Sequence, residues 1–287
     1  MRLNHSGAFL LATLLVYNML TATQQARGSE PQQLLPAGEP VKLSGAAHTT
    51  PASSSQPAPE SRLAEGSPDD IRTSDDLGKW STFYYLHPRP ELTVKALHYA
   101  AKTGMFDQPH TTAIMFTLMT QLFAQNPQLL PSWIAQLSSL SIRNKALVWR
   151  SLRQVNTAES QQLANSLRQQ FPADSRPLLL AQNNPPPQAI EKMDLSPPVL
   201  DMLWISFFIT GDEKYVERIM SALTLWSPDQ HDANKLITAG AAQWSLTSNA
   251  RQHKRVMTIC QSARKTQPQW KSQLDKVIDQ AQAPPHN

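Results

Sequence analysis

Hydrophobic residues recur at helical spacing along most of the chain after about residue 90. Between residues 109 and 126 they stand at offsets of zero, three, four, seven and eight, which places them on one side of a helix. These residues are Met115, Leu118, Met119, Leu122 and Phe123. The same reasoning predicts helices over residues 90–103, 132–140, 142–155, 158–171, 199–210, 216–223, 233–244, 256–263 and 270–281. No segment has the alternating pattern of a strand.

Two of the predicted helices stand out by their pattern. Residues 199–210 are apolar on all sides, which predicts a central, buried helix with Ser196 as its N-cap, Pro197 at its first position and Gly211 at its end. In residues 233–244 the apolar stripe is expected to face the core, with Gly240 allowing a neighbour to approach closely. That stripe consists of Ala233, Leu236, Ile237, Gly240, Ala241 and Trp244.

The pattern predicts an all-α fold, an irregular array of about ten amphipathic helices arranged as stacked helical hairpins. Tight turns are expected at residues 103–104, 210–211 and 248–249. Because the turns are unevenly spaced, no repeat of fixed length fits them, and the array resembles tetratricopeptide proteins only loosely.

The remaining segments divide the chain. Residues 1–22 contain a short apolar run typical of a secretory signal peptide, or of an anchor that is not cleaved. Residues 23–78 are rich in Pro, Ala and Ser and are expected to form a disordered linker. Two helical subdomains follow, at residues 79–171 and 199–283, joined by a Pro-rich connector at 172–198. The pattern leaves open whether the two share one core.

Composition limits the classes of partner. The 287 residues carry a formal charge of only +4, which is mild for a protein that coats nucleic acid, so no nucleic-acid partner is expected. The positive excess is concentrated near the C-terminus, in residues 251–280. There Arg251, Lys254, Arg255, Arg264 and Lys265 form a possible interaction face for an anionic surface, with a plain solvated face as the alternative.

The sequence lacks the common catalytic motifs, including the Gly-x-Ser-x-Gly elbow, the His-Glu-x-x-His zinc motif and the phosphate-binding loop. Cys260 is the one cysteine, and its place on an apolar stripe indicates a core residue. Asp201, the one charge in residues 199–210, is a weak candidate for a general base, and interaction with the helix dipole is the simpler interpretation. No catalytic residue, cofactor or metal site is predicted.

Two segments resemble parts of uncharacterised exported helical proteins of bacteria. They are residues 201–211 (DMLWISFFITG) and residues 84–90 (YYLHPRP), and the likeness extends over about residues 80–280. The resemblance implies a location in the bacterial envelope and no known activity.

Together these observations predict an exported protein of the periplasm or cell envelope, with anchoring in the inner membrane through residues 8–22 as the alternative to cleavage. The expected function is non-catalytic, that of a protein-binding or scaffold module with an envelope protein as its partner. Two alternatives stay open. One is an enzyme with a divergent carboxylate site that acts on cell-wall polymers. The other is a peripheral binder of anionic membrane through the basic C-terminal helices.

Overall fold

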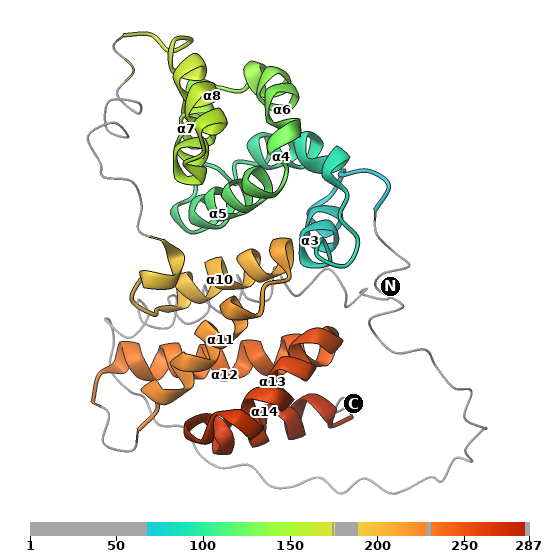
Figure 1. Cartoon of the computed structure of the whole chain (residues 1–287), viewed down its shortest axis with the longest axis vertical. Coiled ribbons are helices and arrows are strands. Elements are labelled where there is room, and N and C mark those ends of the chain that lie inside the picture. Colours follow the sequence, from blue (N-terminus) through green and yellow to red (C-terminus); the bar gives the residue numbers. More distant parts are fainter. Residues whose placement is uncertain (1–67, 174, 176–188, 228–230, 285–287) are drawn as a thin grey trace, which may run out of the picture. The chain divides into compact units, whose positions relative to one another are not determined.

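The computed structural model describes residues 68–173, 175, 189–227 and 231–284. Contacts divide the chain into two units, residues 1–58 and 59–287, and every described residue belongs to the second. The described residues form eleven α-helices and no strand, which confirms the all-α prediction (Figure 1). The α-helices are α3 (Ser74–Thr82), α4 (Thr93–Lys102), α5 (Pro109–Gln125), α6 (Leu130–Gln136), α7 (Ile142–Val155), α8 (Ala158–Arg168), α10 (Pro197–Thr210), α11 (Glu213–Ser221), α12 (Ala233–Gln252), α13 (Lys254–Thr266) and α14 (Lys271–Gln282).

Short 3-10 helices extend or join several of these elements. They are η1 (Pro90–Leu92), η2 (Pro127–Leu129), η3 (Leu137–Ser139), η4 (Ile190–Lys192), η5 (Ala222–Leu225) and η6 (Pro268–Trp270). Three of the six, η1, η2 and η6, begin at a proline, whose fixed φ suits the first helical position. These three prolines therefore mark where helices start.

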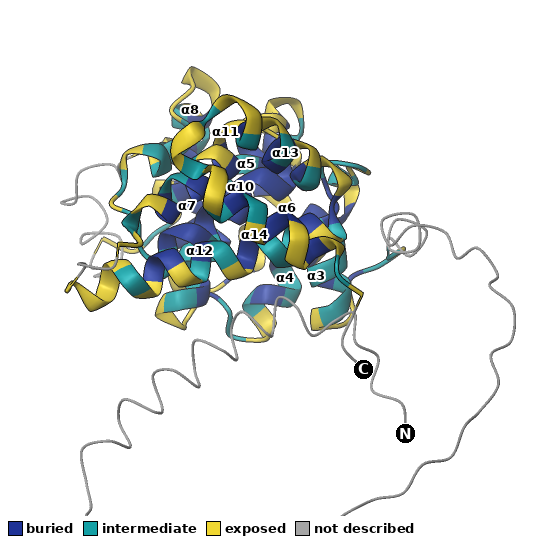
Figure 2. Ribbon diagram, turned by 90° about the horizontal axis from the view of Figure 1, so that it is seen from below, coloured by how far each residue is buried: buried dark blue, intermediate teal, exposed yellow. Residues whose placement is uncertain are grey.

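Helix α10 is central, as its pattern predicts. It packs against α5 and α3 and also against α11 and α12, and ten of its side chains are buried (Figures 1 and 2). Pro197 takes the first position as expected, but the Ser196 side chain makes no capping hydrogen bond. The helix ends at Gly211, whose φ of 68° lies in the left-handed region that glycine adopts without strain.

One hydrophobic core joins the two predicted helical subdomains. It contains residues of α4 and α5 from the first and of α10, α12 and α14 from the second. Fully buried members include Leu97, Phe123, Leu203, Leu246 and Leu274. Because α10 covers α5 and also contacts α11 and α12, the halves form one folded body.

Two predicted boundaries differ from the structure. Helix α3 begins at Ser74, inside the predicted linker, because Thr73 and Asp76 form a capping box there. Helix η4 and the start of α10 likewise lie inside the predicted connector at 172–198. The signal peptide or anchor, residues 23–67 of the predicted linker and most of the connector lie outside the described residues.

The prediction for α12 was wrong in two ways. The helix runs through residues 248–249 without a turn and ends at His253, which has extended backbone. Its buried side consists of Thr238, Ala239, Ala242, Ser245, Leu246 and Ala250. The predicted stripe of Ile237, Gly240 and Trp244 is exposed instead.

None of the described helices is long and apolar enough to cross a membrane.

Candidate functional site

Residues 84–90 and residues 201–211, which are far apart in the sequence, meet in the structure. The backbone N–H of Tyr85 donates to the carbonyl oxygen of Phe208 at 2.9 Å. A Cβ added at Gly211 would lie 3.3 Å from the ring of Tyr85, so this glycine also makes room for the tyrosine. Trp80 and Tyr84 are almost fully buried and pack edge to face. These segments therefore join α3 to α10, and their role is structural.

His253 lies at the centre of the same junction, between α12 and α13. Its ring stacks on Phe83 at 4.8 Å and on Phe208 at 5.2 Å between centroids. Its Nδ1 is hydrogen-bonded to the Tyr85 hydroxyl at 3.1 Å, while its buried Nε2 has no hydrogen-bond partner. Burial lowers the pKa of His253 to about 3. The imidazole is therefore neutral at physiological pH.

Asp201 is positioned by α10 and faces His110 in the first turn of α5. The carboxylate oxygen and His110 Nε2 are 3.6 Å apart, and both side chains are largely buried. Burial raises the pKa of Asp201 to about 7 and lowers that of His110, so both groups shift toward their neutral forms. Asp201 is the fifth residue of α10, beyond the first turn, so the predicted interaction with the helix dipole does not account for its environment.

The predicted basic face is not a continuous surface of free charges. Arg251 lies on α12 and donates to the carbonyl oxygens of Gln280 and Ala281, at the C-terminal end of α14. Arg255, on α13, is 3.5 Å from Glu213, and Arg264 is 3.4 Å from Asp275. Three of the five predicted residues thus make contacts between helices, and Arg251 and Arg255 lie on different helices.

The other two predicted residues of this face are exposed. They are Lys254 and Lys265, and both lie on α13. A second group of basic residues, on α7, is also engaged: Arg143 pairs with Asp107, and Arg150 and Arg153 lie over the rings of Phe116 and Trp149. Helix α7 packs against α5 and α8, whereas α13 packs against α11, α12 and α14. The two basic groups therefore belong to different layers of helices.

Cys260 is a core residue, as predicted. Its side chain is fully buried, and burial raises the pKa of its thiol to about 12, so the reactive thiolate does not form near neutral pH. Within the described part of the chain, no group of three or more His, Cys, Asp or Glu residues is placed to hold a metal ion.

The most unusual surface of the described residues is the exposed side of α12. Ile237 and Trp244 are 39% and 42% exposed, and Trp226, which directly follows η5, is 59% exposed. Helix η5 packs along α12. Gly240 and Ala241 lie between Ile237 and Trp244, and a Cβ added at Gly240 would meet nothing within 4 Å. Together Ile237, Gly240, Ala241 and Trp244 are called the α12 face below.

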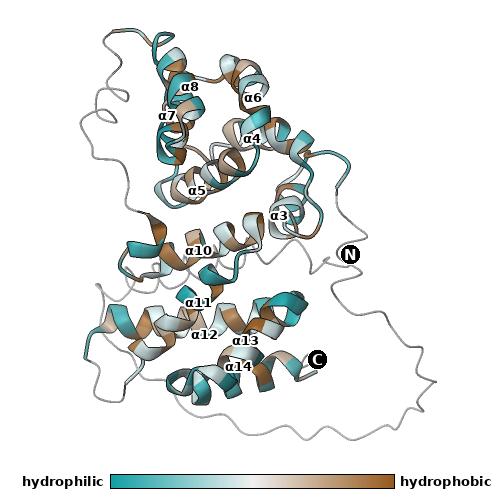
Figure 3. Cartoon of the chain, in the orientation of Figure 1, coloured by the Kyte–Doolittle hydropathy of each residue, from teal (hydrophilic) through white to brown (hydrophobic). Residues whose placement is uncertain are grey.

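Sequence reasoning assigned the residues of the α12 face to the core. One feature of the sequence could have indicated an interface instead. Residues 236–250 contain no charged side chain, while Lys235 and Arg251 flank them. Figure 3 shows this as a helix with little strongly hydrophilic colour along its middle. Depletion of charge together with exposed tryptophan is typical of the centre of a protein interface.

No protein-family model matches this chain, and neither a curated protein nor a solved structure is significantly similar to it.

Proposed function

We propose that the protein is a non-catalytic binding module of the bacterial cell envelope, which holds a protein partner on the α12 face. The observation that carries this proposal is the exposure of Ile237 and Trp244 on the same side of α12. A single exposed apolar residue is ordinary, but an exposed isoleucine and an exposed tryptophan two turns apart, in a stretch of helix without charged side chains, are unusual.

The form of the face favours a helical partner. Ile237, Gly240, Ala241 and Trp244 follow the spacing i, i+3, i+4, i+7, which is the footprint of one side of a helix. Gly240 and Ala241 have little side chain, so a partner helix can approach closely between the larger side chains of Ile237 and Trp244. Tryptophan is enriched among the residues that contribute most to binding.

The envelope location rests on residues 8–22, which have the pattern of a secretory signal and lie outside the described residues. Cleavage is tested by mass spectrometry of the mature N-terminus, and intact Met1 would favour the anchor.

The partner proposal is tested by site-specific photocrosslinking in native cells. A photoreactive phenylalanine analogue at position 244 or 237 is expected to give one discrete protein adduct, identified by mass spectrometry. The matched control carries the analogue at Gln162, an exposed residue of α8, and is expected to give none. Absence of an adduct from both positions of the α12 face would contradict the proposal.

Substitution separates binding from folding. The variant Ile237→Glu with Trp244→Glu places two charges at exposed positions, so the melting temperature should change little. Co-purification of the crosslinked partner should nevertheless fall at least tenfold, because two charges would be buried without partners in the complex.

An enzyme remains the second candidate, and the observation that favours it is Asp201. A carboxyl group with a pKa of about 7 beside a histidine is suited to general acid–base chemistry. Glycoside cleavage also needs a second carboxylate near the first. Hydrolysis of cell-wall material that disappears in Asp201→Asn, while the fold is kept, would establish this alternative.

Membrane binding through the basic C-terminal helices is the third candidate. It predicts binding to anionic vesicles that collapses as salt is added. Because Arg251, Arg255 and Arg264 make contacts within the protein, the exposed lysines of α13 and α14 are the better candidates to carry it, namely Lys254, Lys265, Lys271 and Lys276. Changing all four lysines to glutamine should then abolish the salt-sensitive binding.

A further inference from the structure

A hollow lies at the turn between α13 and α14, and no residue of the α12 face lines it. Its lining residues are Arg264 and Lys265 at the end of α13, Pro268 in η6, and Lys271 and Asp275 in α14. Its volume is about 580 Å³, within the range of roughly 300–1,000 Å³ that is usual for small-molecule sites. These five residues are called the α13–α14 hollow below.

The α13–α14 hollow holds positive charge that the protein does not neutralise. Three cations against one carboxylate leave a net charge of +2. The carboxylate of Asp275 lies 3.4 Å from Nη1 of Arg264, and this contact uses one nitrogen of the guanidinium. Lys265 and Lys271 are exposed, and neither pairs with a carboxylate of the described residues.

Helix stability explains only part of this charge. Arg264 and Lys265 lie in the last turn of α13, where a cation interacts favourably with the helix dipole. Lys271 is the first residue of α14, where the dipole favours an anion, and the first turn of α14 contains no acidic residue. The repulsion at Lys271 therefore needs another explanation, and an anion held between this lysine and the cations of α13 would remove it.

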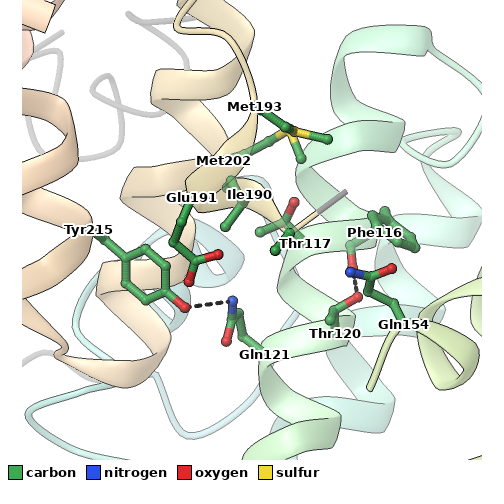
Figure 4. Close-up of a pocket in the computed structure, with 11 residues that line it drawn as sticks. Phe116, Thr117, Thr120, Gln121, Gln154, Ile190, Glu191, Met193, Met202 and Tyr215 are labelled. Atoms are coloured by element: carbon green, nitrogen blue, oxygen red, sulfur yellow. Dashed lines mark hydrogen bonds between the residues drawn. The ribbon is translucent and has the colours of Figure 1, made fainter. Parts of the chain in front are cut away.

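A second hollow, of about 120 Å³, lies among α5, α7, η4, α10 and α11 and differs in this respect (Figure 4). There the side-chain amide of Gln121 donates to Tyr215 Oη at 3.2 Å, and the carboxylate of Glu191 is 3.4 Å from Nζ of Lys214. The carboxylate and the tyrosine thus already have partners within the protein. Of these two hollows, the α13–α14 hollow is the one whose charges are left for a ligand.

The charge and the number of donors favour a phosphate monoester. Near pH 7 such a group carries about 1.5 to 2 negative charges and presents three terminal oxygens as acceptors. It can thus balance the charge of the hollow and accept a charge-assisted hydrogen bond from each of the three cations. A carboxylate or a phosphate diester carries a single negative charge and would leave part of the positive charge uncompensated.

We propose that the α13–α14 hollow binds a phosphate monoester, whose terminal oxygens accept hydrogen bonds from Arg264, Lys265 and Lys271. The phosphate can belong to a soluble ester or to a lipid headgroup, and the chemistry that the hollow recognises is the same. This proposal does not rest on the function proposed for the α12 face. It also differs from membrane binding by the exposed lysines as a group, because it requires one saturable site.

The test is an NMR titration of the full ¹⁵N-labelled chain at constant ionic strength. Methyl phosphate, a monoester, is compared with dimethyl phosphate, a diester of similar shape with a single charge. We expect methyl phosphate to shift the backbone amide signals of residues 264–271 as one saturable site, with an affinity at least about fivefold higher than that of dimethyl phosphate. The affinity for methyl phosphate should fall between pH 7 and pH 5, because the monoester gains a proton near about pH 6, whereas that for dimethyl phosphate should stay constant.

Variants separate the hollow from the general positive charge of this region. Lys265→Gln and Lys271→Gln each remove one of the three cations, so each should lower the affinity for methyl phosphate about three- to tenfold. The control is Lys276→Gln, which changes an exposed lysine of α14 that does not line the hollow. It removes the same charge and should change the affinity less than about twofold. All three positions are exposed, so the melting temperature should change little.

Vesicles then distinguish the sources of the phosphate. Phosphatidic acid ends in a phosphate monoester, whereas phosphatidylglycerol is a diester, and vesicles of the two are matched in surface charge. Tighter binding to phosphatidic acid, lost in the double variant Lys265→Gln, Lys271→Gln, identifies a lipid headgroup as the source. Equal binding to both vesicles, together with saturable binding of methyl phosphate, identifies a soluble ester.

The titration and its control can each contradict the proposal. Equal affinities for methyl phosphate and dimethyl phosphate would overturn it. Shifts that spare residues 264–271, or an effect of Lys276→Gln as large as that of Lys271→Gln, would do the same. Because no residue of the α12 face is changed, such a failure leaves the crosslinking result unaffected.

Discussion

His253 combines complete burial with a titratable ring. Its pKa is lowered to about 3 in the folded protein, whereas an unfolded histidine has a pKa near 6.5. Between these values the unfolded state binds more protons, so the free energy of unfolding falls as the pH is lowered. We expect this residue to contribute a slope of up to about 1.4 kcal/mol per pH unit. The variant His253→Phe, which can still stack between Phe83 and Phe208, should flatten the slope in urea unfolding measured from pH 4 to 7.

An unchanged slope in His253→Phe would mean that the histidine is not held neutral by the junction of α3, α10 and α13.

Asp201 should change the pH dependence of stability in the direction opposite to that of His253. Its pKa is raised to about 7, from an ordinary value of 3.8, so between these values the folded state binds more protons than the unfolded state. The contribution of this group to the free energy of unfolding therefore falls as the pH rises through this window. Asp201→Asn removes the effect, and the variant should gain stability relative to the unaltered protein by up to about 1.4 kcal/mol per pH unit from pH 4 to 7. Urea unfolding at four pH values measures it.

An ion pair between Asp201 and His110 would give Asp201→Asn the opposite effect on stability. If Asp201 and His110 formed an ionised pair across their 3.6 Å separation, removing the carboxylate would cost stability near neutral pH. A variant that becomes less stable as the pH rises would thus show that Coulombic attraction outweighs desolvation at this site.

At the scale of the helices, two glycines with opposite surroundings form a matched pair. Gly211 ends α10 with a φ of 68°, and a Cβ there would lie 3.3 Å from Tyr85. Gly240 lies inside α12 with open space around it. We expect Gly211→Ala to lower the free energy of unfolding by about 1–2 kcal/mol and Gly240→Ala to raise it by up to about 1 kcal/mol. Thermal unfolding of both variants tests the pair, and equal effects would contradict it.

Some helix starts and ends were predictable because local chemistry decides them. Thr157 caps α8, Pro197 begins α10 and Gly211 ends it, each through its own backbone or side chain. The orientation of α12 was not predictable, because in the sequence the stripe that is exposed looks like the more hydrophobic side of the helix. Its core side includes Thr238 and Ser245, whose hydroxyls donate to backbone oxygens of their own helix and can thus be buried. Packing against α14 and η5 decides which side is covered, and that information is not local.

The same limit applies to the site residues. The apolar residue types on the α12 face are visible in the sequence, but their exposure depends on what α13, α14 and η5 leave uncovered. Asp201 attracted notice as the one charge of an apolar helix, and its partner His110 comes from a helix about ninety residues earlier.

For the whole molecule, the central place of α10 determines how the chain unfolds. Apolar side chains of α10 contact α5 on one side and α11 and α12 on the other, so neither half of the described chain has a complete core without it. Unfolding should therefore be a single cooperative transition despite the Pro-rich connector. Fluorine-labelled tryptophan reports on both halves at once, because Trp133 and Trp149 lie before the connector and Trp204 and Trp270 after it. Their NMR signals should lose intensity with one midpoint in urea, and Leu203→Ala, which opens a cavity in α10, should shift all four midpoints together by about 2–5 kcal/mol of stability. Separate midpoints for the two pairs, with only Trp204 and Trp270 responding to Leu203→Ala, would instead show two domains that fold independently.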